Sequence, residues 1–108
     1  MAKAIYWQKG ETLDYTPVAD HEAGDIVSLG TRVGVIGENV KTGQPGHVHV
    51  VGVFRMPKAQ GEIAMGDALF FSETDGTVGK TVEGGIPAGY AAEPAMADST
   101  TVLVKLLG

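Results

Sequence analysis

The segment TDGTVGKTVEGG contains the trio GKT at residues 79–81, which ends the phosphate-binding loop of many nucleotide-binding proteins. That loop requires the pattern G-x-x-x-x-G-K-[ST] between a strand and a helix, so that backbone N–H groups at the helix N-terminus face the phosphates. The first Gly of the pattern falls on Thr74, and the residues after the trio, VEGGIPAG, do not favour a helix. The sequence therefore predicts a hairpin turn at Asp75-Gly76 and no nucleotide site.

A second candidate for chemistry is the pair His47 and His49 in GHVHVVGVF. Residues two apart in a strand point from the same face, and imidazole pairs bind zinc, iron or copper. A cupin-like barrel would add a glutamate shortly afterwards and a third histidine on a later strand, whereas valines and an arginine follow here. Two hypotheses remain: half-exposed strand residues without a ligand, or a metal site completed by His21, Asp20 or Glu22.

Residues for hydrolytic chemistry are sparse. The serines are Ser28, Ser72 and Ser99, and none lies in the strand-turn-helix setting that exposes a nucleophile to a base and an orienting acid. The nearby carboxylates Glu73 and Asp75 fit solvated turn residues. The sequence predicts no catalytic residue, no metal, no cofactor and no small-molecule substrate, and hence no enzyme.

Composition limits the classes of partner. The chain has 108 residues, a net charge of −5, no cysteine and no run of basic residues. An acidic chain does not favour sequence-independent binding to nucleic acid, which depends on Lys and Arg at phosphates. Without cysteine, disulfides and thiolate metal sites are excluded. No apolar stretch is long enough for a membrane span or a signal peptide, so we expect a soluble intracellular protein with no membrane partner.

The elements that must position these residues are short strands. Sixteen glycines and five prolines mark many turns. Between them we expect strands at DIVSLG, TRVGVIG, HVHVVGVFRM, DALFF, AGYAA and TTVLVKLL. Two segments, EAGDIVSL and AMGDALFF, share a Gly-Asp turn before a strand, although two instances do not establish a repeat. The expected fold is mainly β: a small β-barrel or open β-sandwich with little helix.

In the last expected strand, period two places Val102, Val104 and Leu106 on one face. Leu103, Lys105 and Leu107 then share the opposite face. This pattern predicts a strand that is partly covered on both sides.

Residues 1–17 differ from the rest of the chain. They contain Tyr6, Trp7 and Tyr15, have balanced charges, and are interrupted by Gly10 and Pro17. Strand character is weak and confined to the stretch AIYWQ. We expect residues 1–17 to be an N-terminal arm or edge strand and residues 18–108 to be a single β domain. The alternative is an ordinary first strand whose rings fill the core.

The order of these segments resembles a family of tailed-phage and prophage proteins, the capsid cement or decoration proteins. The family has also carried an unknown-function label and a phage recombinase label; the latter fits poorly with an acidic chain that lacks a phosphate loop. The resemblance spans nearly the whole chain, through AIYWQKGETLDYTP, AGDIVSLGTRVGVI, VVGVFRMPKA, MGDALFFSETDGTV and IPAGYAAEPAMADSTTVLVKLL. None of these segments is a catalytic signature, so the resemblance concerns fold and role.

The resemblance implies a structural protein of the virion, made in the bacterial host cytoplasm. Such a protein assembles as a homotrimer on the outer surface of an icosahedral head, at local threefold positions, and stabilises the shell of major capsid protein. Related proteins use an N-terminal arm, which implies a capsid-binding role for Tyr6, Trp7, Gln8 and Tyr15. The alternative function is a metal-dependent small-molecule enzyme on a cupin-like barrel, with His47 and His49 as ligands.

Overall fold

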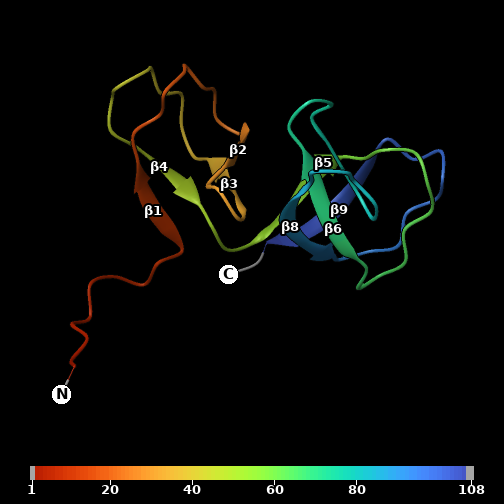
Figure 1. The fold of residues 1–108 in the computed structure, drawn as a ribbon, viewed down its shortest axis with the longest axis horizontal. Helices are drawn as coiled ribbons and strands as arrows, with labels where there is room; N and C mark the ends of the chain where they lie inside the picture. Colours follow the sequence, from red (N-terminus) through yellow and green to blue (C-terminus); the bar gives the residue numbers. More distant parts are fainter. Residues whose placement is uncertain (1, 107–108) are drawn as a thin grey trace.

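The computed structural model describes residues 2–106, which form strands and loops only (Figure 1). The strands are β1 Thr12–Tyr15, β2 Ile26–Ser28, β3 Val33–Ile36, β4 Gly46–His49, β5 Val53–Pro57, β6 Ala68–Ser72, β7 Thr77–Gly79, β8 Ile86–Ala91 and β9 Thr101–Leu106. Because these residues contain no helix, none of them forms a helical membrane span. The expectation of a mainly β fold with short strands is confirmed.

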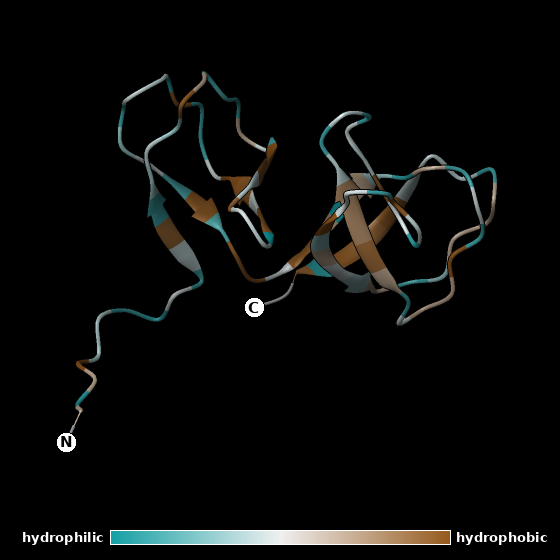
Figure 2. Cartoon of the chain, viewed as in Figure 1, coloured by the Kyte–Doolittle hydropathy of each residue, from teal (hydrophilic) through white to brown (hydrophobic). Residues whose placement is uncertain are grey.

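Two antiparallel sheets make up the fold, with strand orders β1-β4-β3-β2 and β5-β9-β8-β6-β7. The larger sheet curls until Lys58, just after β5, forms a single parallel bridge with Val78 of β7. Residues 2–106 nevertheless form no closed barrel, so of the two expected architectures the open, sandwich-like one is correct. Apolar residues concentrate on strands such as β3, β6 and β9, whereas the loops are largely hydrophilic (Figure 2).

The single strand expected at HVHVVGVFRM is wrong. Residues 50–52 interrupt it, and the halves, β4 and β5, belong to different sheets. Gly52 has a φ of 127°, a conformation that L side chains rarely adopt and that breaks the extended pairing. The break leaves Val50 buried and Val51 exposed, so the valines after His49 do not continue one flat face.

The expected weak strand near residues 4–8 is also wrong, because the strand pairing begins later, at Thr12. β1 is an edge strand that pairs only with β4. The hairpin turn expected at Asp75-Gly76 is confirmed: it joins β6 to β7, and the N–H of Gly76 donates to the carbonyl of Ser72 at 2.8 Å.

The two sheets repeat one four-stranded unit. In the first, β1 pairs with β4, β4 with β3 and β3 with β2; in the second, β5, β9, β8 and β6 pair in the same order, and β7 is an addition. The turns repeat as well. The N–H of Glu22 donates to Asp25 Oδ2 at 3.0 Å, and the N–H of Ala64 donates to Asp67 Oδ2 at 2.8 Å. The two Gly-Asp turns of the sequence are therefore equivalent positions of an internal structural repeat.

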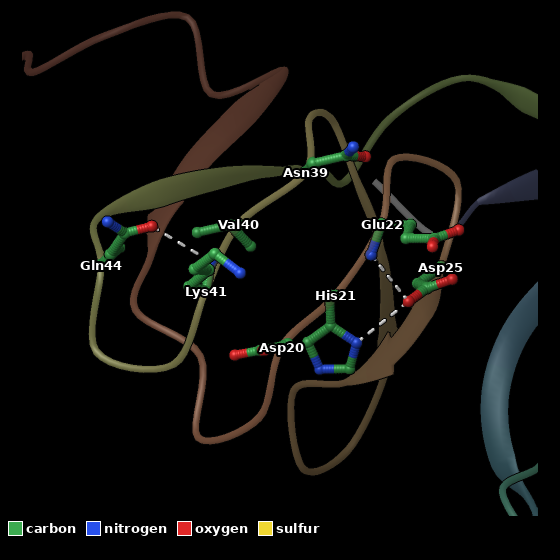
Figure 3. A pocket seen from close by; sticks show the side chains of 8 residues that line it. All are labelled: Asp20, His21, Glu22, Asp25, Asn39, Val40, Lys41 and Gln44. Carbon is green, nitrogen blue, oxygen red and sulfur yellow. Dashed lines mark hydrogen bonds and ion pairs between the residues drawn. The ribbon is translucent and has the colours of Figure 1, made fainter.

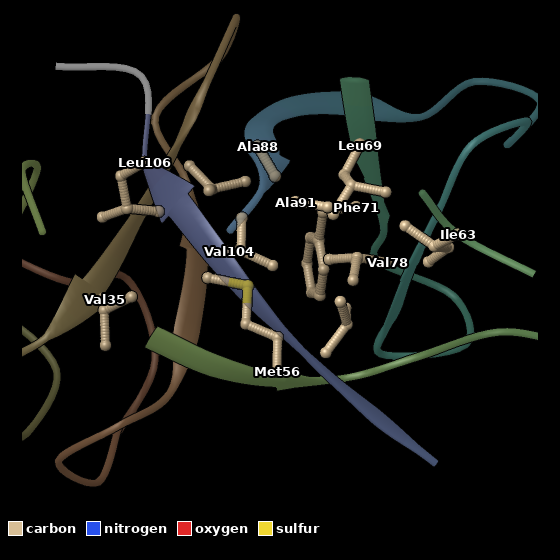
Figure 4. Packing of buried hydrophobic residues seen from close by; sticks show 12 residues of the cluster. Val35, Met56, Ile63, Leu69, Phe71, Val78, Ala88, Ala91, Val104 and Leu106 are labelled. Carbon is tan, nitrogen blue, oxygen red and sulfur yellow. The ribbon is translucent and has the colours of Figure 1, made fainter. Parts of the chain in front are cut away.

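The hydrophobic core has two clusters, which meet at β3. The larger cluster lies on the concave face of the second sheet and includes Val33 and Val35 of β3 together with Met56, Val104 and Leu106 (Figure 4). The smaller cluster packs Ile36 against Val27 and Val48 of the first sheet and against Val40 and Val50 of the adjoining loops. Every residue of β3 is buried, because the strand separates the two clusters.

The alternation expected for the last strand is confirmed. Val102 and Val104 of β9 are fully buried and Leu106 is nearly so, whereas Leu103 and Lys105 are half-buried. Leu107 lies outside the described residues.

Lys58 is buried, with 7% of its surface exposed. Its Nζ donates to three backbone carbonyls, those of Ala59 at 3.0 Å, Ala97 at 3.2 Å and Ser99 at 3.3 Å. Carbonyl dipoles thus take the place of the water that the ammonium loses on burial. The contact fixes the loop before β9 against the end of β5.

Replacing Lys58 with methionine, which keeps the apolar stem, should lower the free energy of unfolding by about 1–3 kcal/mol, since hydrogen bonds to a charged group are lost. Chemical denaturation measures the change. Lys80→Met is the control: this exposed side chain should change stability by less than about 0.5 kcal/mol. Equal effects of the two substitutions would contradict a structural role for Lys58.

Gly89 lies at a β-bulge where β8 passes between β6 and β9. Its φ is 152°, and a Cβ built there would lie 1.9 Å from the carbonyl oxygen of Lys105. Gly61 also has a positive φ of 122°, but nothing lies within 4 Å of a Cβ at that position. Gly89 is therefore required by both backbone conformation and space.

We expect Gly89→Ala to destabilise the protein by about 2–5 kcal/mol, because backbone strain and a steric clash add. Gly61→Ala, which carries the strain without the clash, should cost about 1–2 kcal/mol. Thermal and denaturant unfolding of both variants provide the comparison. A smaller loss at Gly89 than at Gly61 would show that the bulge can relax.

Candidate functional site

The GKT trio has no phosphate-loop geometry. Gly79 is the last residue of β7 and is buried, and a loop rather than a helix follows it. Lys80 lies 3.7 Å from Asp67, and both side chains are partly exposed. The trio therefore ends a hairpin, as the sequence indicated.

The serines also have structural surroundings. Ser28 Oγ accepts a hydrogen bond from the N–H of Gly30 at 3.0 Å, and Ser72 Oγ accepts one from the N–H of Asp75 at 3.2 Å. Both contacts stabilise tight turns. Neither hydroxyl is bonded to a histidine that would activate it.

His47 and His49 share one face of β4, as expected, with ring centroids 6.1 Å apart. Nδ1 of His47 lies 3.1 Å from Glu38 Oε1 on the surface. His49 instead packs on Phe54 of the second sheet, with ring centroids 5.7 Å apart. One imidazole thus faces a carboxylate in solvent and the other takes part in the contact between the sheets.

The remaining histidine lies in a different place, a surface hollow of about 590 Å³ beside β2 (Figure 3). His21 Nδ1 lies 3.2 Å from Asp25 Oδ2 there, and a backbone bridge links His21 to Val40. Across residues 2–106, no three His, Asp or Glu side chains come together as a metal site. The structure thus does not assemble the metal ligand set that the sequence left open.

Asp20 lines the same hollow and has a perturbed pKa. The backbone N–H of Thr42 donates to Asp20 Oδ1 at 2.8 Å, and the Thr42 hydroxyl donates at 3.0 Å. These bonds favour the ionised carboxylate and hold the pKa of Asp20 below its ordinary value, with smaller help from the charge of Lys41. The Asp20–Thr42 contact connects two loops of the first sheet.

The arm residues are the most exposed apolar group of the described chain. Ile5, Tyr6 and Trp7 are 88%, 80% and 85% exposed, and residues 2–10 extend away from the sheets (Figure 1). Gln8 is also exposed, and its amide donates to the carbonyl of Thr12 at 3.4 Å. Tyr15 lies apart from them: it is half-buried in β1 and packs on the smaller core cluster.

Two further exposed apolar groups were not expected from the sequence. Met65 and Met96, 68% and 73% exposed, flank a loop-end hollow of about 430 Å³ that is lined mainly by apolar residues. Val53 and Tyr90, 52% and 45% exposed, lie on the convex face of the second sheet. Strand register, which sequence alone does not give, places Val53 and Tyr90 on that face.

The site is thus an apolar surface without a catalytic constellation. Residues 7–106 match the model of the phage cement protein family. The chain therefore belongs to the phage cement protein family, and its role is a structural one in a phage capsid. Comparison with curated proteins and with solved structures gave no match.

The perturbed pKa of Asp20 predicts a pH dependence. A carboxylate whose pKa is lower in the folded state stabilises that state above its unfolded pKa, near 4, and loses this contribution as the pH falls through the folded pKa. We expect Asp20→Asn to lower the melting temperature at pH 7, and the difference from wild type to disappear as the pH falls below about 4. Asp98→Asn, on another loop, is the control. A difference that stays constant down to pH 2 would contradict the assignment.

Proposed function

We propose that this protein binds the outer surface of an icosahedral phage head at local threefold positions, as a homotrimer, and holds neighbouring major capsid protein subunits together. Membership of the phage cement protein family supports a capsid role. Expression in the host cytoplasm and addition to the finished shell follow from that role. The observation that carries the proposal is the exposed apolar arm, because it offers a binding surface without a catalytic one.

We assign the capsid contact to the arm, with Tyr6 and Trp7 as its anchors. Large aromatic side chains that are exposed in the free protein and buried in a complex often dominate binding. The charges around them balance, since Lys3 and Lys9 are matched by Glu11 and Asp14. Gln8 lies beside these anchors on the arm. Tyr15 would take part separately, through the edge strand β1, because main-chain groups of an edge strand can pair with a strand of a partner.

Three arms on one trimer would strengthen the contact without tight binding by any single arm. Once one arm is bound, the others meet their sites at high effective concentration, so weak contacts combine into a durable clamp. This mechanism needs neither a cofactor nor a substrate. It requires only that the arm be separate from the folded core.

Deleting residues 2–8 should leave the melting temperature nearly unchanged, because these residues pair with no strand, and should abolish binding to undecorated heads. Co-sedimentation with heads measures the binding, and circular dichroism checks the fold. Tyr6→Ala and Trp7→Ala should each weaken binding about thirtyfold per arm, an estimate based on losses of about 2 kcal/mol at interface anchors.

The matched control is Val18→Ala, which removes an apolar side chain that is 90% exposed but lies outside the arm. It should bind heads like wild type. A deletion variant that folds and still binds heads with undiminished affinity would rule out the arm as the contact. Unfolding of that variant would show instead that the arm belongs to the core.

A further inference from the structure

The internal repeat relates the faces of the two sheets residue by residue. One row across the first sheet is formed by Thr12, His49, Val35 and Ile26, which pair in that order. The equivalent row across the second sheet is Val53, Lys105, Tyr90 and Ala68. Directly paired residues point from the same face of a sheet. Each row therefore marks one face, and the two rows mark equivalent faces of the two units.

In the first sheet this face is covered within the chain. Val35 is 4% exposed and belongs to the large core cluster of the second sheet. Ile26 packs against the same cluster, and His49 packs on Phe54. The first unit thus uses this face to cover the edge of the second.

In the second sheet the equivalent face is open. Val53 and Tyr90 are 52% and 45% exposed, and Ala68 at the end of the row is exposed too. Leu103, two residues before Lys105 in β9 and on the same face, is half-buried and opposite Arg55. No residue of 2–106 covers this face in the way that the second sheet covers the first.

The surface that receives the covered face also has a counterpart. Val35 of the first unit packs against residues of the second unit that include Phe54, Met56 and Leu106. The register of β1 and β5 makes Leu13 and Tyr15 the equivalents of Phe54 and Met56. Leu13 is 40% exposed and Tyr15 is half-buried, so the receiving surface of the first unit is also partly open.

We propose that these two open surfaces bind one another between copies of this chain. The face of Val53, Lys105 and Tyr90 on one copy covers Leu13 and Tyr15 of the next, and so repeats between chains the contact that joins the units within a chain. The charges on the two surfaces are opposite: Lys105 lies on the face of one copy, and Glu11 lies two residues before Leu13 on the receiving surface of the next.

The proposal deepens the proposed homotrimer and rests on it. Since two different surfaces meet, the contact is head-to-tail, and such contacts form a closed ring if the rotation between copies closes. Contacts between units of one chain and contacts between neighbouring chains would then alternate around the ring. The receiving surface lies next to the arm, so ring formation would place the arm of each copy beside its neighbour.

Cross-linking tests this geometry, because the chain has no cysteine of its own. The two cysteine positions are Leu13 and Lys105, because their equivalents within the chain, Phe54 and His49, are in contact. Leu13→Cys and Lys105→Cys are made in separate full-length chains. A short bismaleimide should join the two variants when they are mixed, both at high concentration in solution and on heads. Each variant alone should give no cross-linked dimer.

A dimer from Lys105→Cys alone would show a symmetric contact and overturn the proposal, as would a mixture that gives no product in solution or on heads. The chain carrying both cysteines should give one product of fixed size. An open-ended ladder would overturn the closed ring. Binding to heads is measured separately. If the protein binds heads but no cross-link forms there, this interface is wrong and the cement role still stands.

Substitution of the face gives a second readout. Tyr90→Glu should raise the dissociation constant between copies at least tenfold in sedimentation analysis of the full chain, while the melting temperature of dilute protein stays unchanged. Met65→Glu, which alters a more exposed side chain at the loop end, is the matched control and should associate like wild type. Equal effects of the two substitutions, or no effect of Tyr90→Glu, would contradict the proposed face.

Discussion

Burial of β3 on both of its faces is the contact on which the rest of the structure depends. Val33 and Val35 face the core of the second sheet, while Ile36 faces the smaller cluster of the first. A strand of four residues thereby joins two sheets that the chain itself connects only through residues 50–52. Small apolar clusters stabilise a domain of this size only modestly, so a shared strand that contributes to both lets them stabilise each other.

The same four-stranded unit occurs twice, and its differences separate structural from functional positions. Both copies keep the Gly-Asp turn, with a carboxylate bonded to a backbone N–H. At the loop ends they diverge: His21 and Lys41 line a polar hollow in the first unit, whereas Met65 and Met96 line an apolar one in the second. Both units share one order of four strands, so that shared topology does not require this difference at the loop ends.

Side chains with catalytic potential serve the fold in this protein. Ser28 and Ser72 stabilise turns, Lys58 is enclosed by carbonyls, and His49 packs between the sheets. Apolar surface is exposed on the arm, at a loop end and on one sheet face. Exposed apolar surface of this kind marks binding to other proteins, which agrees with membership of the phage cement protein family.

Features that arise within a few residues could be predicted from the sequence: short strands, the Asp75-Gly76 turn, the alternation of β9, and the lack of a phosphate loop. Period two and turn chemistry act locally, so they can be read from neighbours. Tertiary structure decided the break at Gly52, the place of β1 at a sheet edge, the two-sided burial of β3 and the exposure of Tyr90. Each of these depends on which distant strands pair and in which register, and the free energy of that choice comes from burial shared by residues far apart in the chain.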